Sequence, residues 1–276
     1  MPDATARIDP GARVEDSVKV GAGAEVGPGC VLRGDVTLGA GVRLINHVSV
    51  QGPVTIGDNT TVYPGACIGF EPQDVKFKPG MPTAGVKIGR NNLIREHVTI
   101  HAASKTAHPT TVGDNCMLMV NSHLGHDTVI GDNVILVNGC LLAGHVRVGN
   151  NATLSGNTAV HQFCRVGRLA FVSGGVVNAM DVPPFCVSGA RNTVNGLNVV
   201  GLRRSGVSRS EIDALRRVYR DIFRERIPRE EMIERMRPLA AESALVREFM
   251  DFIADRTGKA ICSAHADEDA EAEAIS

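Results

Sequence analysis

The 276-residue chain contains no tryptophan, and aromatic residues of all kinds make up only 4% of it. Large aromatic side chains usually fill a broad globular core, so their scarcity indicates a narrow core packed by smaller residues. Glycine, by contrast, occurs 30 times. A narrow and closely packed core leaves little internal room. We therefore expect any ligand to bind on an outer face or between chains.

Strong charge of one sign and long apolar runs are also missing. Lysine and arginine (29) nearly balance aspartate and glutamate (30), and no long basic tract interrupts the sequence, so a nucleic-acid partner has no support in the composition. No N-terminal apolar segment is typical of a signal peptide, and no apolar run is long enough to span a bilayer. We expect a cytoplasmic protein without stable membrane insertion.

The dominant feature of the sequence is a six-residue repeat. Aliphatic residues fall on every sixth position from Ile8 to Ile68, and a second phase runs from Ile88 to Val172 with one weak beat. Neither a helical period nor simple alternation keeps aliphatic residues six apart for so long. A short internal repeat of this kind is typical of a parallel β-helix. We predict an all-β solenoid of hexapeptide repeats over residues 1–195.

The seven cysteines fit this repeat better than they fit a disulfide or metal framework. Cys30, Cys116, Cys140 and Cys164 all occupy the fifth position of a hexad, where the pattern requires a small residue. Cysteine serves there as a small hydrophobic residue, as in proteins of a reducing compartment. No CxxC pair indicates zinc. The sequence therefore predicts neither a metal nor another cofactor.

Two interruptions predict loops that leave the solenoid. Residues 69–87 shift the phase by two positions, and their polar candidates for function are Gln73, Asp74 and Lys76. Residues 101–111 keep the phase but lack one aliphatic residue, which predicts a weaker loop. Loops on a rigid scaffold often carry function.

The repeat ends near Val172, and the period becomes helical farther on. We predict a small α-helical domain over residues 196–261, with a capping box at Ser208 and Glu211 and further helices over about 229–236 and 244–256. Residues 262–276 are acidic and poor in aliphatic residues. We expect this tail to be disordered.

If three hexads close one triangular coil, residues eighteen apart stack about one strand spacing, roughly 4.8 Å, from each other. One predicted column contains His126, Gly144 and Gln162, and the next contains Asp127, His145 and Phe163. A histidine can take a proton from a hydroxyl group, and a neighbouring carboxylate can orient it. A glycine N–H can stabilise the oxyanion that develops when a carbonyl is attacked. This arrangement suits acyl transfer.

The outward histidines also allow roles outside acyl transfer. Single outward histidines often merely occupy a surface. His101, His123, His126 and His145 could instead be ligands of a zinc-dependent hydrase on the same fold, although His123 and His126 lie only three residues apart across a corner. A third possibility is a non-catalytic interaction protein.

Seven motifs carry a resemblance to a known family, in the right order and spacing over about residues 8–260. They are PQDVK (72–76), IREHVTIH (94–101), NSHLGHD (121–127), LLAGHV (141–146), AVHQFC (159–164), DVPPF (181–185) and NVVGLRRSG (198–206). Together they resemble the acyl-carrier-protein-dependent UDP-N-acetylglucosamine O-acyltransferases that begin lipid A synthesis. The resemblance implies a left-handed β-helix and a homotrimer with its active sites between subunits. It also implies a 3-hydroxyacyl donor carried by acyl carrier protein and UDP-N-acetylglucosamine as the acceptor.

The resemblance also assigns roles to residues: His126 is the general base, Asp127 orients it and Gly144 donates to the oxyanion. The implied substrate-binding positions are Gln73, Asp74, Lys76, His101, His123, His145, His161, Gln162, Asn198 and Arg204. Gly174 matches the position that limits acyl-chain length, and glycine there would admit a longer chain. Val200 and Ser205 depart from the family pattern, which has an acidic and a second basic residue at these positions.

Two further points concern the substrates. Four arginines of the first long helix could attract the acidic carrier protein or could form an ordinary solvated helix face. They are Arg216, Arg217, Arg220 and Arg224. A sister enzyme that acylates a 3-amino sugar would use the same base column. The later N-acyltransferase of the pathway usually has an additional N-terminal domain, for which residues 1–7 are too short.

Overall fold

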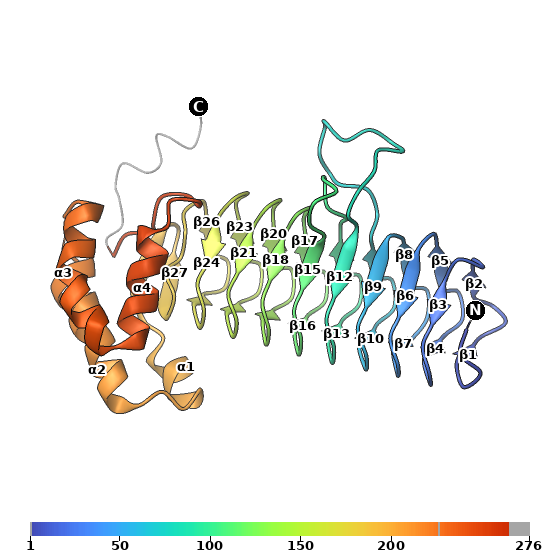
Figure 1. Ribbon diagram of the computed structural model, residues 1–276, viewed down its shortest axis with the longest axis horizontal. Coiled ribbons are helices and arrows are strands. Elements are labelled where there is room, and N and C mark those ends of the chain that lie inside the picture. The colour runs from blue at the N-terminus through green and yellow to red at the C-terminus, as the bar shows by residue number, and fades with distance from the viewer. Residues whose placement is uncertain (1, 226, 265–276) are drawn as a thin grey trace.

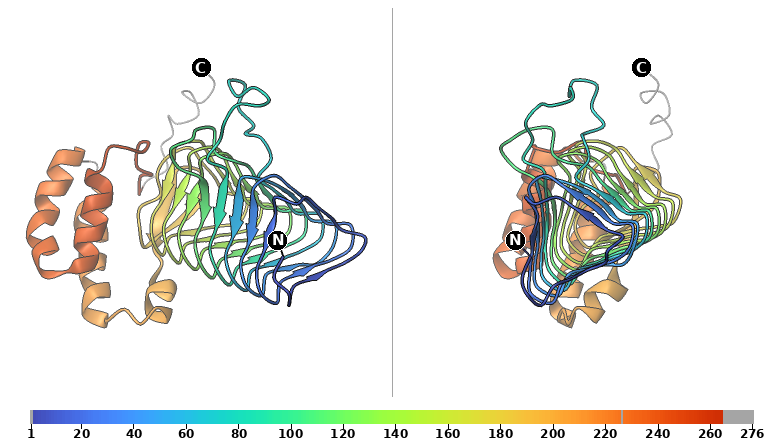
Figure 2. Two further views of the ribbon diagram at one scale, coloured as in Figure 1. Left: turned by 45° about the vertical axis from the view of Figure 1, so that its right-hand side comes forward. Right: turned by 90° about the vertical axis from the view of Figure 1, so that its right-hand side faces the viewer.

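The computed structural model describes residues 2–225 and 227–264 as a long triangular solenoid with a helical unit at its C-terminal end (Figure 1). Three sheets of eleven, nine and eight strands form the three faces, and each coil contributes one strand to each face (Figure 2). All pairings between coils are parallel, and one antiparallel hairpin, β27 with β28, extends the eleven-stranded sheet. The predicted parallel solenoid is confirmed.

The strands of each face are short and follow in chain order. The eleven-stranded sheet consists of β1 (Arg7–Ile8), β4 (Glu25–Val26), β7 (Arg43–Leu44), β10 (Thr61–Val62), β13 (Leu93–Ile94), β16 (Met117–Leu118), β19 (Ile135–Leu136), β22 (Thr153–Leu154), β25 (Phe171–Val172), β27 (Cys186–Ala190) and β28 (Thr193–Leu197). The nine-stranded sheet consists of β2 (Arg13–Val14), β5 (Val31–Arg33), β8 (Ser49–Gln51), β11 (Cys67–Ile68), β14 (Thr99–Ile100), β17 (His123–Leu124), β20 (Leu141–Leu142), β23 (Ala159–Val160) and β26 (Val177–Asn178). The eight-stranded sheet consists of β3 (Lys19–Val20), β6 (Val36–Leu38), β9 (Val54–Ile56), β12 (Val86–Ile88), β15 (Thr110–Val112), β18 (Val129–Ile130), β21 (Arg147–Val148) and β24 (Arg165–Val166).

Strand register explains the two phases of the repeat. In regular coils a residue pairs with the residue eighteen positions on, as Leu118 pairs with Leu136. Across the first loop Thr61 pairs with Leu93, 32 positions on, and across the second loop Leu93 pairs with Met117, 24 positions on. The first insertion therefore changes the hexad phase by two residues, and the second keeps it, as predicted.

The aliphatic residue of each hexad points into the solenoid. Leu32, Ile56, Ile94 and Leu124 are fully buried, and together with their equivalents they form one continuous core. Ile8 is 36% exposed although it has the same place in the repeat. It belongs to the first coil, which has no coil beneath it to cover the core.

A ladder of side-chain caps supports the corner between the eight- and eleven-stranded sheets. The carboxylates of Asp58, Asp114 and Asp132 each accept a hydrogen bond from a backbone N–H one coil below, at 2.7–2.8 Å. Asn150 does the same at 3.0 Å. The recurrent sequence glycine, aspartate, asparagine in these hexads thus satisfies corner N–H groups that the strands leave free.

The helical unit consists of α1 (Val199–Arg204), α2 (Arg209–Val218) continued by the π-helix η1 (Tyr219–Phe223), α3 (Arg229–Glu242) and α4 (Ala244–Ala254). Helix α1 was not predicted from the sequence, and α3 extends six residues beyond its predicted end at about residue 236. None of the helices in the described residues is long and apolar enough to cross a membrane.

The predicted capping box is only half correct. Ser208 accepts from the N–H of Glu211 and caps α2. The Glu211 carboxylate, however, accepts from Ser243 Oγ and from the N–H of Leu245 at the start of α4. Glu211 therefore links α2 to the start of α4 through hydrogen bonds.

The repeat continues farther than predicted, and the folded chain extends past residue 262. β26 adds one more strand to the nine-stranded sheet beyond Val172. Ile261 and Ser263 form parallel bridges to Asp181 and Thr193, and Cys262 between them is fully buried. Residues 261–263 thus belong to the folded chain, whereas the tail predicted over 262–276 otherwise lies, from residue 265 on, outside the described residues.

Arg165 of β24 joins the solenoid to the end of α4. Its guanidinium contacts Asp181 and Asp255 at 2.7 Å each and donates to the carbonyl of Phe252 at 3.1 Å. The Arg165 and Asp181 side chains are 9% and 0% exposed. Removing one partner of such a buried pair leaves an uncompensated charge.

We predict that Arg165→Met lowers the free energy of unfolding by about 3–5 kcal/mol, because Asp181 loses its buried partner. Arg168→Met is the matched control, since the Arg168–Glu248 pair is partly exposed and contributes at most about 1 kcal/mol. Chemical denaturation followed by circular dichroism measures both. Equal losses in the two variants would contradict the prediction.

Candidate active site

The predicted columns lie at the corner between the nine- and eight-stranded sheets, which we call the histidine corner (residues 125–127, 143–145 and 161–163). Successive coils stack there through backbone hydrogen bonds. The N–H of His145 donates to the carbonyl of His126 at 2.9 Å, and the N–H of Phe163 donates to the carbonyl of Gly144 at 3.1 Å. The eighteen-residue spacing therefore brings His126 and Gly144 together, as predicted.

Gly144 leaves the space that the His126 ring occupies. A Cβ atom at position 144 would lie 2.7 Å from both Nε2 and Cε1 of His126. Real Cβ atoms do not approach so closely, so an alanine there would displace the ring. The Nε2 edge of the imidazole thus lies directly against the Gly144 backbone.

The opposite edge of the imidazole faces a carboxylate. His126 Nδ1 and Asp127 Oδ2 are 2.7 Å apart, and His145 Nε2 lies 3.7 Å from the same oxygen. The hydroxyl and the N–H of Ser104 also donate to Asp127 Oδ2, at 2.6 and 3.1 Å. Ser104 was not predicted as a site residue, because it belongs to a loop in which no repeat fixes a residue's place.

Asp127 is held as a charged acceptor. Burial alone would raise the pKa of its carboxyl, but the hydrogen bonds from Ser104 and His126 outweigh that effect and lower it below its usual range. For His145, burial lowers the pKa more than the charge of Asp127 raises it. Near neutral pH the corner therefore contains one carboxylate beside a neutral His145.

The second column forms a stack of rings. His145 lies parallel to Phe163, with ring centroids 4.5 Å apart and an angle of 9° between the planes. The His145 ring also packs edge-on against the His126 ring, with the two ring centroids 5.1 Å apart. Asp127, His145 and Phe163 all have left-handed backbone conformations, with φ of 59°, 63° and 66°. Phenylalanine is unfavourable in this conformation, although Phe185 adopts it as well.

Two further histidines lie beside this corner on the nine-stranded sheet. His123 Nδ1 is 2.8 Å from the hydroxyl of Thr99, and its ring meets that of His101 at 5.4 Å. His101 Nδ1 contacts the carbonyl of Glu71 at 2.7 Å. Burial, with a smaller contribution from His101, lowers the pKa of His123 to about 4. His123 is therefore neutral near pH 7.

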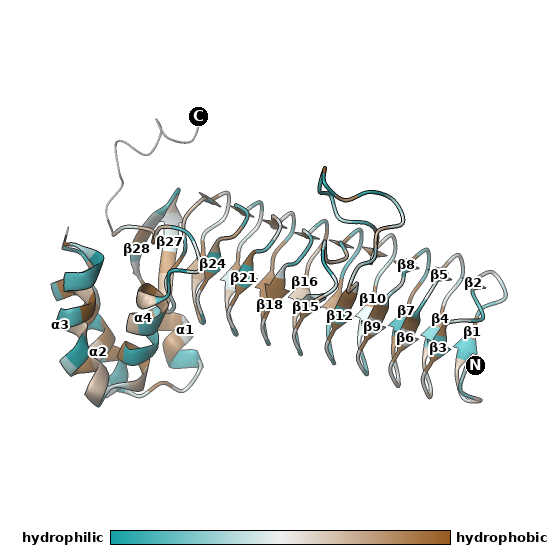
Figure 3. Ribbon diagram, turned by 45° about the horizontal axis from the view of Figure 1, so that its top comes forward, coloured by the Kyte–Doolittle hydropathy of each residue, from teal (hydrophilic) through white to brown (hydrophobic). Residues whose placement is uncertain are grey.

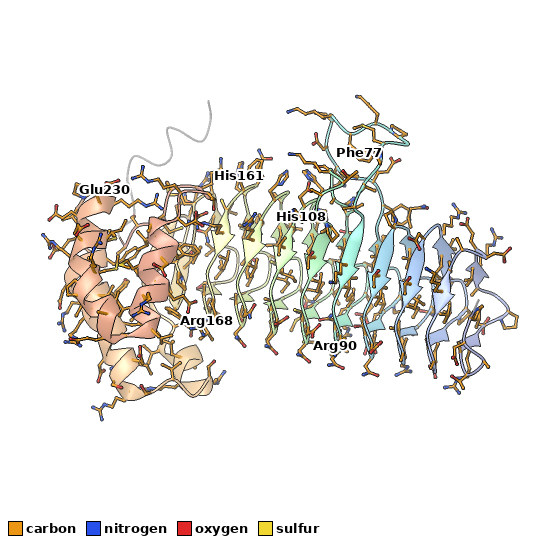
Figure 4. All side chains as sticks on the ribbon, viewed as in Figure 1. Phe77, Arg90, His108, His161, Arg168 and Glu230 are labelled. Atoms are coloured by element: carbon orange, nitrogen blue, oxygen red, sulfur yellow. The ribbon has the colours of Figure 1, made fainter. Side chains whose placement is uncertain are left out.

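Both predicted loops leave the solenoid on the same edge as the histidine corner, between the nine- and eight-stranded sheets, two coils and one coil before residues 125–127. Figure 4 shows Phe77, on the first loop, projecting above the edge of the solenoid along which His108 and His161 also lie. Gln73 and Lys76 are exposed, and Asp74 is partly buried. His161 and Gln162 are exposed one coil beyond Gly144. These residues surround the corner, in contrast to the more remote candidates.

The remaining candidates lie elsewhere in the chain. Asn198 is the N-cap of α1, where its Oδ1 accepts from the Gly201 N–H and its Nδ2 donates to the Leu169 carbonyl, both at 2.9 Å. Arg204 ends the same helix. Gly174 lies at the corner between the eleven- and nine-stranded sheets, at the opposite edge of the nine-stranded sheet from His126. One chain alone does not bring these residues to His126.

A cavity of about 310 Å³ opens beside His145 on the side of the eight-stranded sheet. Its wall includes Lys105, Arg147, Phe163 and Thr257. Arg147 follows from the strand register, because it precedes the buried Val148 and must point outward. Thr257 could not be predicted from the strand register, because it lies after α4 and is distant in sequence from the coils that line the cavity.

Nitrogen and oxygen atoms of His126, Asp127 and His145 lie within 4.8 Å of one another, a set that could hold a metal ion. Zinc bonds of about 2.0–2.1 Å in a tetrahedral site separate neighbouring ligand atoms by roughly 3.3 Å. The 2.7 Å between His126 Nδ1 and Asp127 Oδ2 is instead the length of a hydrogen bond. The geometry favours a proton-transfer site.

Two family models match the chain. The second domain of UDP-N-acetylglucosamine O-acyltransferases matches residues 181–262, and the six-repeat bacterial transferase hexapeptide matches residues 109–144. The acyl-carrier-protein-dependent UDP-N-acetylglucosamine O-acyltransferase of Thermodesulfovibrio yellowstonii is 41% identical over 208 residues, which cover 75% of this chain and 80% of that protein. The enzyme of the same name from Aquifex aeolicus is 53% identical over 194 residues, which cover 70% and 74%.

Solved structures agree with these matches over nearly the whole chain. The UDP-N-acetylglucosamine acyltransferase of Bacteroides fragilis superposes with a TM-score of 0.86 at 33% identity, covering 92% of this chain and 99% of that one. The Arabidopsis enzyme gives a TM-score of 0.85 at 32% identity, covering 95% and 100%. A solenoid of the opposite hand could not superpose so well, so the left-handed coil that the resemblance implies is confirmed.

We predict that His123 makes stability depend on pH. Its pKa of about 4 lies below the ordinary 6.5, so the unfolded chain binds more protons between these values and stability falls as pH decreases. The free energy of unfolding should fall by roughly 2 kcal/mol between about pH 7.5 and pH 5. His123→Gln should remove this part of the dependence in denaturation curves at the two pH values. Parallel behaviour of variant and wild type would contradict it.

Proposed function

The chain belongs to the acyl-carrier-protein-dependent UDP-N-acetylglucosamine O-acyltransferases, and from this membership we propose the reaction and the residues that perform it. The enzyme transfers a 3-hydroxyacyl chain from acyl carrier protein to the 3-hydroxyl of UDP-N-acetylglucosamine, with His126 as general base. This is the first step of lipid A synthesis. The observation that carries the proposal is the His126 ring, held between the Asp127 carboxylate and the Gly144 backbone.

The proposed chemistry uses both edges of the imidazole. Nε2 of His126 takes the proton of the sugar hydroxyl as its oxygen attacks the thioester carbonyl. Asp127 accepts from Nδ1–H and stabilises the imidazolium that forms. The Gly144 N–H donates to the carbonyl oxygen as it becomes an oxyanion. When the tetrahedral intermediate collapses, the carbon–sulfur bond breaks and His126 returns the proton to the leaving thiolate.

The loops and the neighbouring histidines support the site proposed for the acceptor. Asp74 and Lys76 lie on a loop that leaves the same edge of the solenoid two coils before His126, and we assign them to the sugar and its phosphates. Lys76 is exposed, and no carboxylate among the described residues pairs with its ammonium group. The His101 and His123 rings, together with the exposed His161 and Gln162, can donate or accept hydrogen bonds from sugar hydroxyls.

We further propose that three chains assemble into a trimer. Outward residues of the first coils are charged, whereas Leu93, Leu141 and Val177 on the eleven- and nine-stranded sheets are 40%, 47% and 43% exposed (Figure 3). The eight-stranded sheet exposes Lys87 and Arg147, with Val129 as its one large hydrophobic residue among those that are exposed in the described chain. The other two faces thus suit burial against other copies better than the third does.

Assembly also accounts for candidates that one chain leaves apart. Asn198 and Arg204 at the nucleotide end, and Gly174 at the acyl chain, would reach His126 only from a neighbouring copy. A Cβ atom on Gly174 meets nothing nearer than 3.5 Å, which leaves room for a long acyl chain.

Among the helix arginines proposed to meet the carrier protein, Arg216 and Arg220 already pair with Asp213 and Asp221. Because both substrates are cytoplasmic metabolites, we place the reaction in the cytoplasm.

We predict that His126→Ala lowers acyl transfer by at least about a thousandfold, because the attacking hydroxyl loses its base. His47→Asn is the matched control, since His47 is an outward corner histidine whose left-handed backbone asparagine also adopts. The transfer is measured by mass spectrometry of the products. The donors are acyl carrier proteins loaded with 3-hydroxyacyl chains of several lengths, and the acceptors are UDP-N-acetylglucosamine and its 3-amino analogue. An active His126→Ala enzyme would remove the proposed base, and exclusive use of the 3-amino sugar would reassign the acceptor.

Gly144→Ala should lower kcat by about a hundredfold, because its methyl group displaces the His126 ring and shifts the proposed oxyanion donor. Gly156→Ala tests the same substitution at the same hexad position, where a Cβ atom meets nothing nearer than 3.4 Å. We expect Gly156→Ala to retain near-normal kcat and stability. Similar kcat values for the two variants would show that the close contact with His126 is unimportant.

A further inference from the structure

Ser104 lies on the second loop, between β14 and β15, and the first loop holds it in place. The N–H of Ala102 donates to the carbonyl of Phe70 at 2.9 Å, and the N–H of Ala103 donates to the carbonyl of Gly85 at 3.1 Å. The N–H of Ala84 returns a bond to the carbonyl of Lys105 at 2.9 Å. Three backbone contacts therefore place Ser104 relative to the loop that carries Asp74 and Lys76.

Three hydrogen bonds converge on a single oxygen of Asp127. Oδ2 receives the hydroxyl of Ser104 at 2.6 Å and its N–H at 3.1 Å, and His126 Nδ1 lies 2.7 Å away. The Asp127 N–H donates to Thr110 Oγ1 at 2.9 Å, which holds the backbone of the carboxylate. The side chains of His126 and Asp127 are each 13% exposed, so water has little access to compete.

We propose that Ser104 is a positioning residue that fixes the tautomer of His126. This inference rests on the proposed function, and it assigns a part to a residue outside every motif that carries the family resemblance. Ser104 orients Asp127 so that Oδ2 accepts from Nδ1–H of His126. Nε2 is then left without a proton, beside Gly144, where the acceptor hydroxyl must be deprotonated.

The tautomer depends on which groups around Oδ2 can donate a hydrogen bond. A backbone N–H can only donate, and the Ser104 hydroxyl has a carboxylate oxygen as its partner, so Oδ2 acts as an acceptor toward both. An ionised carboxylate has no proton to give, so the hydrogen between Oδ2 and the ring belongs to Nδ1. Without the hydroxyl, the carboxylate can turn about its χ2 angle and the other tautomer becomes populated.

Position 104 also links two parts of the site. Its loop is held by Phe70 and by Ala84 and Gly85, at the two ends of the first loop, so the backbone that positions the Ser104 donors is anchored where that loop leaves the solenoid.

The test compares Ser104→Ala with Ser104→Thr, which keeps the hydroxyl, and with Thr106→Ala on the same loop, where the side chain is exposed. Ser104→Ala should lower kcat by about tenfold to a hundredfold, the effect of one hydrogen bond to a charged group, with KM for the UDP-sugar within about twofold. Ser104→Thr should recover most of kcat, and Thr106→Ala should match wild type. An unchanged kcat in Ser104→Ala would overturn the proposal.

A double-variant experiment distinguishes positioning from general loss of structure. In an Asp127→Asn background, Ser104→Ala should cause no further loss of residual activity, because the group it orients is already changed. An equal loss in both backgrounds would show that Ser104 acts through the fold.

Ring-nitrogen NMR shifts give a readout that does not depend on activity. In protein labelled with 15N-histidine, the His126 signals, identified by their absence from His126→Ala, should report a protonated Nδ1 and a bare Nε2. The two shifts should approach each other in Ser104→Ala, and unchanged shifts would overturn the proposal. If the wild-type enzyme transfers no acyl chain, the proposed function fails while this measurement still tests Ser104.

Discussion

The whole structure depends on the backbone hydrogen bonds that stack one coil on the next at a fixed spacing. They carry each residue over the residue eighteen positions earlier, so His126 and Gly144 meet because of the ladder and not because of their own attraction. A side chain fixed in this way has little freedom to lose when a substrate binds. The proposed base and oxyanion donor are thus preorganised by the same bonds that stabilise the solenoid.

Periodic features of this protein could be predicted from the sequence, because a repeat converts chain position into spatial position. The columns at the histidine corner and the phase change at the first loop follow from counting residues. Ser104 could not be placed in this way, because a loop has no period and its course is decided by contacts with residues 69–87. The resemblance to a family assigned roles that counting alone could not supply.

Tertiary contacts also overrode local signals in the C-terminal part. Glu211 has the spacing of a capping box, yet its carboxylate finds stronger partners at the start of α4 than in its own helix. Residues 261–263 directly precede an acidic segment, but Cys262 is fully buried against the last coil. Local propensity is a weak guide when a packed neighbour offers more burial or a better acceptor.

The histidine corner differs from most other corners in the residue types that adopt the left-handed backbone conformation. Most corners elsewhere use asparagine or glycine for the left-handed residue, whereas here the chain uses Asp127, His145 and Phe163. Each such residue costs roughly 1 kcal/mol or more relative to a favourable conformation, and the stacked coils tolerate it. A convex corner of this kind contacts a ligand from one side only. The two loops add a second side, and in the proposed trimer a neighbouring copy would supply the third.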